Sequence, residues 1–123
     1  MISADFVLGN MTDDLVDLTC EFCGKEEDKT LRFPKFMYPS YVDRTMKTAL
    51  DIQEHIIIAN AMQSSSNERR YHQDIAKGKC ILMEHLIGIA YRRKYISRKQ
   101  HDRWQKLNAD IHWKLFNWMK YKA

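Results

Sequence analysis

The cysteines are the first residues whose spacing suggests chemistry. Cys20 and Cys23 form a Cys-x-x-Cys pair, which is the spacing of many zinc ligands and of thiol redox sites. A structural zinc site needs further ligands, and the third cysteine, Cys80, is distant in the chain. Redox pairs stand at a helix N-terminus, which lowers the pKa of the thiol, whereas this pair falls near the expected end of a helix. We therefore expect two small buried side chains, with a metal or redox protein as the weaker alternative.

Other catalytic patterns are missing from the sequence. A ferritin-like di-iron site requires Glu-x-x-His, but His55 and His85 each follow a glutamate directly, and adjacent residues of a helix do not face one another. The glycine-rich signatures of phosphate loops, dinucleotide-binding turns and serine hydrolases do not occur either. We predict a protein that is not an enzyme and that has no catalytic residues, metal or cofactor.

Clustered arginines and lysines carry the clearest signal for binding. Five of them surround one expected turn, namely Arg92, Arg93, Lys94, Arg98 and Lys99. Crowding like charges costs free energy unless an anion offsets it, so we predict that this turn contacts the phosphates of a nucleic acid. Three further bases are predicted to support it, namely Arg69, Arg70 and Lys77. Such contacts tolerate any base sequence; the alternative is a set of solvated helix ends.

The distribution of charge also favours an anionic partner. The net charge is +4, but residues 1–31 hold eight acids and two bases, whereas residues 32–123 hold eight acids and eighteen bases. A basic region of this size attracts nucleic acid through the release of counterions. The first residues contain early acids and no basic segment, so no secretory signal is expected. Because no apolar run is long enough to span a membrane and the cysteine number is odd, we expect a cytoplasmic protein.

Four segments with apolar residues at helical spacing must position these side chains. They cover about residues 3–23, 40–62, 68–93 and 98–121. Ser97 and Gln100 form a capping box at the start of the last segment, while the two prolines are expected to keep residues 32–39 out of the helices. Only four glycines occur, too few for the turns of a β-sandwich. We predict one all-α domain over residues 1–123, an antiparallel (up-down-up-down) four-helix bundle.

Two helices carry apolar residues on more sides than a lone bundle needs. In the last helix, Trp104 and Trp118 share the apolar stripe, but Trp113 lies about opposite to it. An exposed tryptophan between lysines is typical of a contact with another chain or of a platform on which bases stack; the alternative is a ring covered only by lysine stems. The third helix has a second apolar side. We therefore predict an oligomer or partner interface formed by Trp113, Phe116, Met83 and Ile87.

Two stretches of the chain resemble a family of small bacterial four-helix-bundle proteins. In residues 32–61 the clearest shared feature is the tripeptide FPK just before the second helix. In residues 70–121 it is an apolar helix that ends in a basic turn, followed by an aromatic residue, Ile-Ser and a last helix that ends near a tryptophan. The family includes proteins encoded in intervening sequences of 23S rRNA genes and the accessory variability determinant of diversity-generating retroelements. The basic character of this chain is closer to the second branch.

The resemblance implies a homopentamer in which the bundles form a barrel-like ring with a basic surface. It also implies a non-catalytic accessory protein that binds the reverse transcriptase of the retroelement, together with RNA or DNA, and supports mutagenic cDNA synthesis. The polymerase would carry the chemistry. Two alternatives stay open: a structural oligomeric adaptor that binds acidic protein partners, and a 23S rRNA intervening-sequence-type protein of unknown role.

Overall fold

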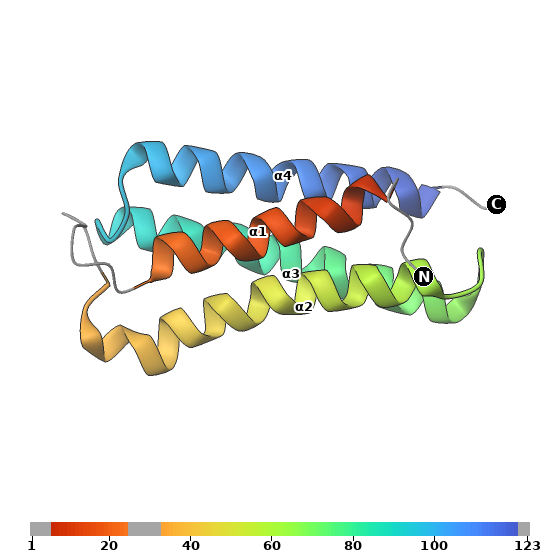
Figure 1. Ribbon diagram of the computed structural model, residues 1–123, viewed down its shortest axis with the longest axis horizontal. Coiled ribbons are helices and arrows are strands. Elements are labelled where there is room, and N and C mark those ends of the chain that lie inside the picture. Colours follow the sequence, from red (N-terminus) through yellow and green to blue (C-terminus); the bar gives the residue numbers. More distant parts are fainter. Residues whose placement is uncertain (1–5, 25–32, 121–123) are drawn as a thin grey trace.

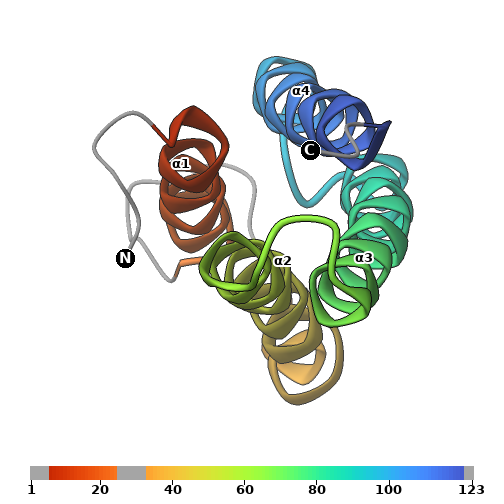
Figure 2. The same ribbon diagram turned by 90° about the vertical axis from the view of Figure 1, so that its right-hand side faces the viewer.

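The computed structural model describes residues 6–24 and 33–120, which form four long helices (Figure 1). They are α1 (Val7–Cys23), α2 (Asp43–Ala61), α3 (Asn67–Arg92) and α4 (Arg98–Lys120). Successive helices run in opposite directions; α2 packs on α3, α3 on α4, and α1 on both α2 and α4 (Figure 2). No β-strand occurs among the described residues. The prediction of an all-α, up-down-up-down bundle is confirmed.

Helix α1 is continuous through its glycine. The predicted start at residue 3 lies outside the described residues, and the first helical residue is Val7. Gly9 is buried under the ring of Phe6, where an added Cβ would lie 2.7 Å from Phe6 Cδ2. The Phe6 ring in turn packs edge-on against Trp118 of α4, with ring centroids 5.6 Å apart. Glycine at this position therefore gives the Phe6 ring room to lie against α1 and to contact Trp118.

The segment before α2 is more helical than the prolines predict. Pro34 is extended, with φ −61° and ψ 150°, but a 3₁₀ turn, η1 (Lys35–Met37), and a π-helical turn, η2 (Tyr38–Val42), follow it. Pro39 lies in the first turn of η2, where its missing N–H group costs no hydrogen bond. The prediction of a non-helical segment is therefore wrong for residues 35–39. Residue 32 lies outside the described residues.

The core contains side chains from all four helices. Its largest fully buried apolar members are Leu15, Ile52, Ile56, Met83, Ile87, Trp104, Ile111 and Leu115. Met83 and Ile87 are 0% exposed, so they face the other helices of the same bundle and present no surface to a partner. The prediction that these two residues form an interface is wrong. Helix α3 has two apolar sides, and Met83 and Ile87 lie on the side that packs into the core.

The core tryptophan is held by a threonine. Trp104 is fully buried, and its Nε1 donates to Thr19 Oγ1 of α1 at 3.2 Å. The Thr19 hydroxyl itself donates to the Leu15 carbonyl one turn earlier, at 2.7 Å. A buried indole N–H needs an acceptor, and this chain of hydrogen bonds supplies one. The prediction that Trp104 belongs to the core is confirmed, and the bond fixes α4 against α1.

Candidate nucleic-acid interface

The turn between α3 and α4 is built by local hydrogen bonds. The N–H of Lys94 donates to the Tyr91 carbonyl at 3.0 Å, and the N–H of Tyr95 donates to the Ala90 carbonyl at 2.8 Å. Lys94 has a left-handed backbone with φ 63°. These features make a Schellman motif, which satisfies the last carbonyls of α3. Tyr95 is buried after the turn, so the backbone that carries the basic residues is fixed.

The start of α4 is closed by the predicted capping box. The N–H of Ser97 donates to Gln100 Oε1 at 2.8 Å, and the N–H of Gln100 donates to Ser97 Oγ at 3.1 Å. Arg98 and Lys99 occupy the first turn of α4, which contains no acidic residue. The N-terminus of a helix carries a partial positive charge, which repels the charges of Arg98 and Lys99. No acidic residue in the first turn offsets this repulsion. This end of α4 therefore favours an anion.

All five predicted phosphate contacts lie at this turn and are exposed. They are Arg92, Arg93, Lys94, Arg98 and Lys99. Arg93 Nε donates to the Tyr95 hydroxyl at 3.5 Å, and this bond raises the pKa of the guanidinium, which stays charged. Arg98 Nε lies 3.8 Å from Asp102 Oδ2 in an exposed ion pair of the kind that contributes little. The turn thus presents a group of exposed cations on a fixed backbone.

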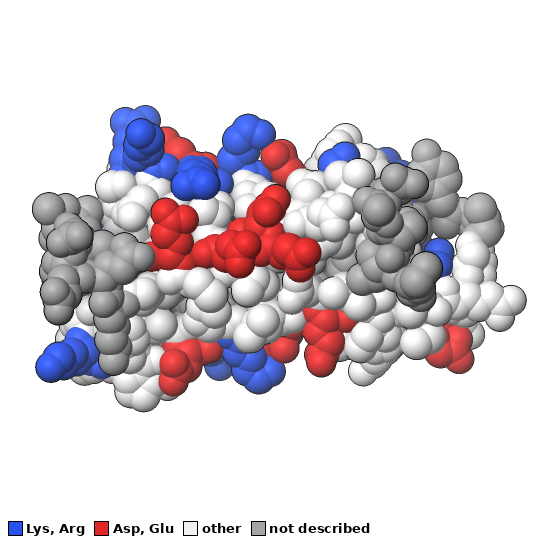
Figure 3. All heavy atoms as spheres, viewed as in Figure 1, with Lys and Arg blue, Asp and Glu red and all other residues white. Residues whose placement is uncertain are grey.

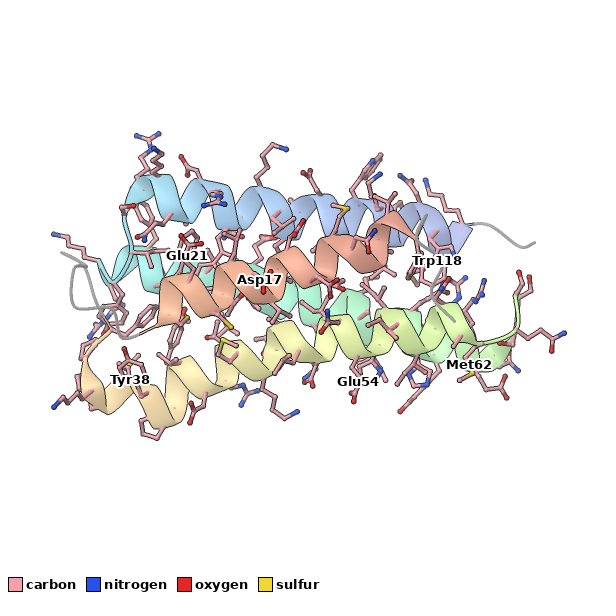
Figure 4. The ribbon with its side chains drawn as sticks, in the orientation of Figure 1. Asp17, Glu21, Tyr38, Glu54, Met62 and Trp118 are labelled. Atoms are coloured by element: carbon pink, nitrogen blue, oxygen red, sulfur yellow. The ribbon has the colours of Figure 1, made fainter. Side chains whose placement is uncertain are left out.

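Arg69 and Arg70 lie at the opposite end of the bundle. They stand in the first turn of α3, about 35 Å from Arg92 at 1.5 Å per residue. Arg69 Nε and Nη2 donate to the carbonyls of Ala59 and Met62, at 3.0 and 2.8 Å, and cap the C-terminus of α2. Figure 4 shows Met62 and Trp118 at this end. The prediction that Arg69 supports the turn is corrected: its guanidinium has a structural role.

Arg70 and Lys77 also have neighbours of their own. Arg70 Nη1 donates to the Met119 carbonyl of α4 at 3.3 Å. Lys77 Nζ lies over the ring of Phe116, 5.5 Å from its centroid. Arg70 is as remote from the turn as Arg69, and Lys77 stands about 22 Å along α3 from Arg92 at 1.5 Å per residue. The structure therefore brings together five of the eight predicted basic residues and separates the other three from them.

A hollow of about 560 Å³ lies between α3 and α4, away from the basic turn. Trp113 and Phe116 form one of its walls; their ring centroids are 6.4 Å apart and the ring planes are inclined by 36°. Trp113 is 62% exposed, which confirms that it points away from the core. Lys120 Nζ lies 4.5 Å from the Phe116 centroid. The predicted aromatic pair is thus exposed to solvent beside two cations.

The exposed side of α1 is acidic. Asp13, Asp14, Asp17 and Glu21 are all exposed there. Figure 3 shows the resulting row of acidic side chains over α1, and Figure 4 labels Asp17 and Glu21 within it. Arg103 and Lys106 of α4 border this row across a shallow hollow. The four acidic residues of α1 thus form one face of the bundle, distinct from the basic turn.

The cysteines differ in their surroundings. Cys23 and Cys80 are buried, but Cys20 is exposed, so the prediction of burial is wrong for Cys20. Burial raises the pKa of the Cys80 thiol to about 12, which makes it unreactive. Within residues 6–24 and 33–120, no three histidine, cysteine, aspartate or glutamate side chains are grouped so that they could hold a metal ion.

A histidine pair joins α2 and α3, and sequence reasoning missed it. His55 Nδ1 and His72 Nδ1 are 2.8 Å apart, and the two rings stack with centroids 5.1 Å apart. One nitrogen must donate and the other accept, so the bond is lost when both rings are protonated. Burial, and next the neighbouring His72, lower the pKa of His55. The sequence signal is weak, because the partners are on different helices.

The fold is similar to that of a solved structure. It is the crystal structure of a protein of unknown function from the S23 ribosomal protein family of Bacteroides thetaiotaomicron VPI-5482. The match has a TM-score of 0.74 at 15% sequence identity, and covers 93% of this chain and 99% of that chain. No protein-family model and no curated protein matches the sequence. At this identity the likeness shows the fold alone.

The helices are amphipathic rather than uniformly apolar. In the part of the chain that the structure describes, none of them combines the length and the apolar character that crossing a membrane requires.

Proposed function

We propose that this protein is a non-catalytic nucleic-acid-binding protein of the cytoplasm that contacts phosphates through the α3–α4 turn. The observation that carries the proposal is the position of Arg98 and Lys99. They add charge to a helix N-terminus whose first turn has no acid, beside three further exposed bases. A phosphate would relieve the repulsion among these groups. Their exposure suits contacts to the nucleic-acid backbone, which give affinity without base specificity.

The proposal extends to an accessory role in a diversity-generating retroelement. It is supported by the sequence resemblance over residues 32–121, and by the likeness in fold to a protein of the S23 ribosomal protein family. In this role the chain binds the reverse transcriptase and its RNA or DNA, and supports mutagenic cDNA synthesis by the polymerase. Co-expression with the reverse transcriptase of the same retroelement tests it: we expect the two proteins to purify together and cDNA synthesis to require both.

We also propose that the chain assembles with copies of itself, as the pentamer that the resemblance implies. The sequence resemblance carries this part of the proposal, and the acidic face of α1, which lies apart from the basic turn, is a surface suited to contacts between copies. Native mass measured at moderate salt tests the assembly. A pentamer supports the proposal, and a monomer at every concentration contradicts it.

The experiment on the basic turn compares two variants of equal charge. In the first, the five bases of the turn are changed to serine. In the matched control, five exposed bases elsewhere are changed, namely Arg44, Lys47, Arg103, Lys106 and Lys114. We expect the affinity for RNA to fall much further in the first variant, because its charges meet phosphates directly. Equal losses would mean that only net charge matters. Salt-resistant binding to a protein partner with no RNA affinity would favour the structural adaptor.

A further inference from the structure

The hollow between α3 and α4 combines aromatic, polar and cationic groups. Its wall is the exposed pair of Trp113 and Phe116, and Lys77 and Lys120 lie over the Phe116 ring. The volume of about 560 Å³ falls in the range of small-ligand sites. Aromatic faces beside lysines are the groups on which proteins stack the bases of single strands. A base in a duplex cannot enter, since its two faces are already stacked.

The wall of the hollow also includes a residue whose acceptor has no donor and is almost entirely covered by its neighbours. Asn108 is 3% exposed and lines the hollow. Its Nδ2 donates to the Cys80 carbonyl of α3 at 3.0 Å, which fixes the orientation of the amide. Among the described residues, no donor reaches Oδ1, the other atom of that amide. A buried polar atom without a partner lowers stability, so its presence calls for an explanation such as a ligand.

Further polar side chains line the hollow together with Asn108. Gln105 and His112 line the hollow from α4, and Glu84 lines it from α3. Gln105 Nε2 donates to the Glu84 carbonyl at 2.9 Å, and the Oε1 atom of the same amide is a second acceptor group. Amide and carboxylate acceptors of this kind recognise the amino groups of bases. A sulfate ion or a phosphodiester group alone would gain nothing from them, because neither has a hydrogen to donate.

We propose that this hollow binds one unpaired base of a single-stranded nucleic acid. The base stacks on Trp113, its exocyclic amino group displaces the side chains that cover Asn108 Oδ1 and donates to that atom, and Lys77 and Lys120 contact the adjoining phosphates. The preferred bases are those that carry an amino group, adenine and cytosine among them, over uracil and thymine. The inference rests on the proposed function and adds to it a second site, at which the protein distinguishes single strands from duplexes.

The test measures the binding of fluorescent eight-nucleotide RNAs by anisotropy. The probes are the A, C and U homopolymers and a duplex of the same length. We expect Trp113→Ala to weaken binding of the A and C strands about 5- to 150-fold, the range for loss of one stacked base, and to leave duplex binding unchanged. Asn108→Leu should reduce the preference for A and C over U. The control is Tyr71→Ala, because Tyr71 is 61% exposed on α3 and does not line the hollow.

Each outcome bears on the inference. If Trp113→Ala and Tyr71→Ala behave alike, the hollow is not a base site, although the basic turn can still bind phosphates. If Trp113→Ala lowers the native mass of the protein without changing its RNA affinity, the hollow is a contact between subunits and the inference is overturned. If wild-type protein binds none of the probes at low salt, the proposed function fails as well. Because Trp113 is exposed, its replacement should leave the fold intact. Thermal melting verifies that each variant is folded.

Discussion

At the scale of single residues, Lys94 has an unfavourable backbone conformation within the basic turn. A left-handed conformation costs a residue with a Cβ about 1 kcal/mol, and glycine is usual at this position of a Schellman motif. Lys94 has φ 63° all the same. The sequence thus places a charge where the fold alone would favour glycine, which agrees with a binding role for the turn.

The first prediction concerns this residue. Lys94→Gly should raise the free energy of unfolding by up to about 1 kcal/mol, because it removes the left-handed strain, while it weakens RNA binding through loss of a cation. Urea denaturation and anisotropy measure the two effects. Lys94→Ala is the control, since it removes the charge and keeps the Cβ. If Lys94→Gly lowers stability, the account of the turn is wrong.

Arg69 illustrates the opposite case, a basic residue used for structure. Arg69→Met should lower the free energy of unfolding by about 1.5–3 kcal/mol, because it leaves carbonyls at the end of α2 without a charged donor. Arg70→Met makes the same change in charge at a neighbour with one long hydrogen bond, 3.3 Å to the Met119 carbonyl, and should cost less. Chemical denaturation of both variants decides. Equal stabilities would remove the capping role from Arg69.

The histidine pair predicts how stability depends on pH. The pKa of His55 is lowered by burial and by His72, so the unfolded chain binds the proton more readily than the folded one. The stability from this site is present above about pH 6.5, the ordinary pKa of histidine, and is lost as the pH falls below it. The neighbouring charges Asp51, Glu54 and Lys79 shift the midpoint without reversing the sign, because burial is the largest cause.

The measurement for this prediction is thermal or urea unfolding between pH 7.5 and 5.5. Wild-type protein should lose stability over this range, and His72→Gln should lose less, because the second imidazole is gone. His85→Gln changes an exposed histidine on α3 and serves as the control. A wild-type stability that rises as the pH falls would contradict the assignment.

At the scale of helices, local patterns were good guides and contacts between helices were not. The capping box of Ser97 and Gln100 and the outward direction of Trp113 follow from spacing within one helix, and both are confirmed. The direction of Met83 could not be predicted, since α3 has two apolar sides and only its packing on α2 and α4 selects one. The carbonyl partners of Arg69 belong to another helix, which spacing along α3 does not reveal.

Two glycines should respond oppositely to the same change. Gly78 is an exposed residue of α3, and an added Cβ there meets nothing within 4 Å. Gly78→Ala should therefore raise the free energy of unfolding by about 0.5–1 kcal/mol. At Gly9 the Cβ would lie 2.7 Å from the Phe6 ring, so Gly9→Ala should give no gain or a loss. Urea denaturation compares the two variants. A similar gain at both positions would show that α1 is not held close to Phe6.

At the scale of the whole molecule, charge is separated in space as well as along the chain. The acidic side chains of α1 form one face, and the basic turn lies at the end where α3 meets α4 (Figure 3). The sequence showed this polarity, because the acids are concentrated in residues 1–31. The prediction overlooked that Arg69 and Arg70 lie at the far end from the turn, although the length of the expected third helix already places them there.

The most direct measurement for the central claim is the salt dependence of RNA affinity, for wild-type protein and for the variant with all five bases of the turn changed to serine. A single strand contributes a slope of about −0.7 per phosphate contact in a plot of log affinity against log salt concentration. If all five bases contact phosphates, the slope of the variant should be smaller in magnitude by about 3.5. The slope of the matched five-base control should change much less. A variant with the affinity and slope of wild-type protein would contradict the claim that this turn binds nucleic acid.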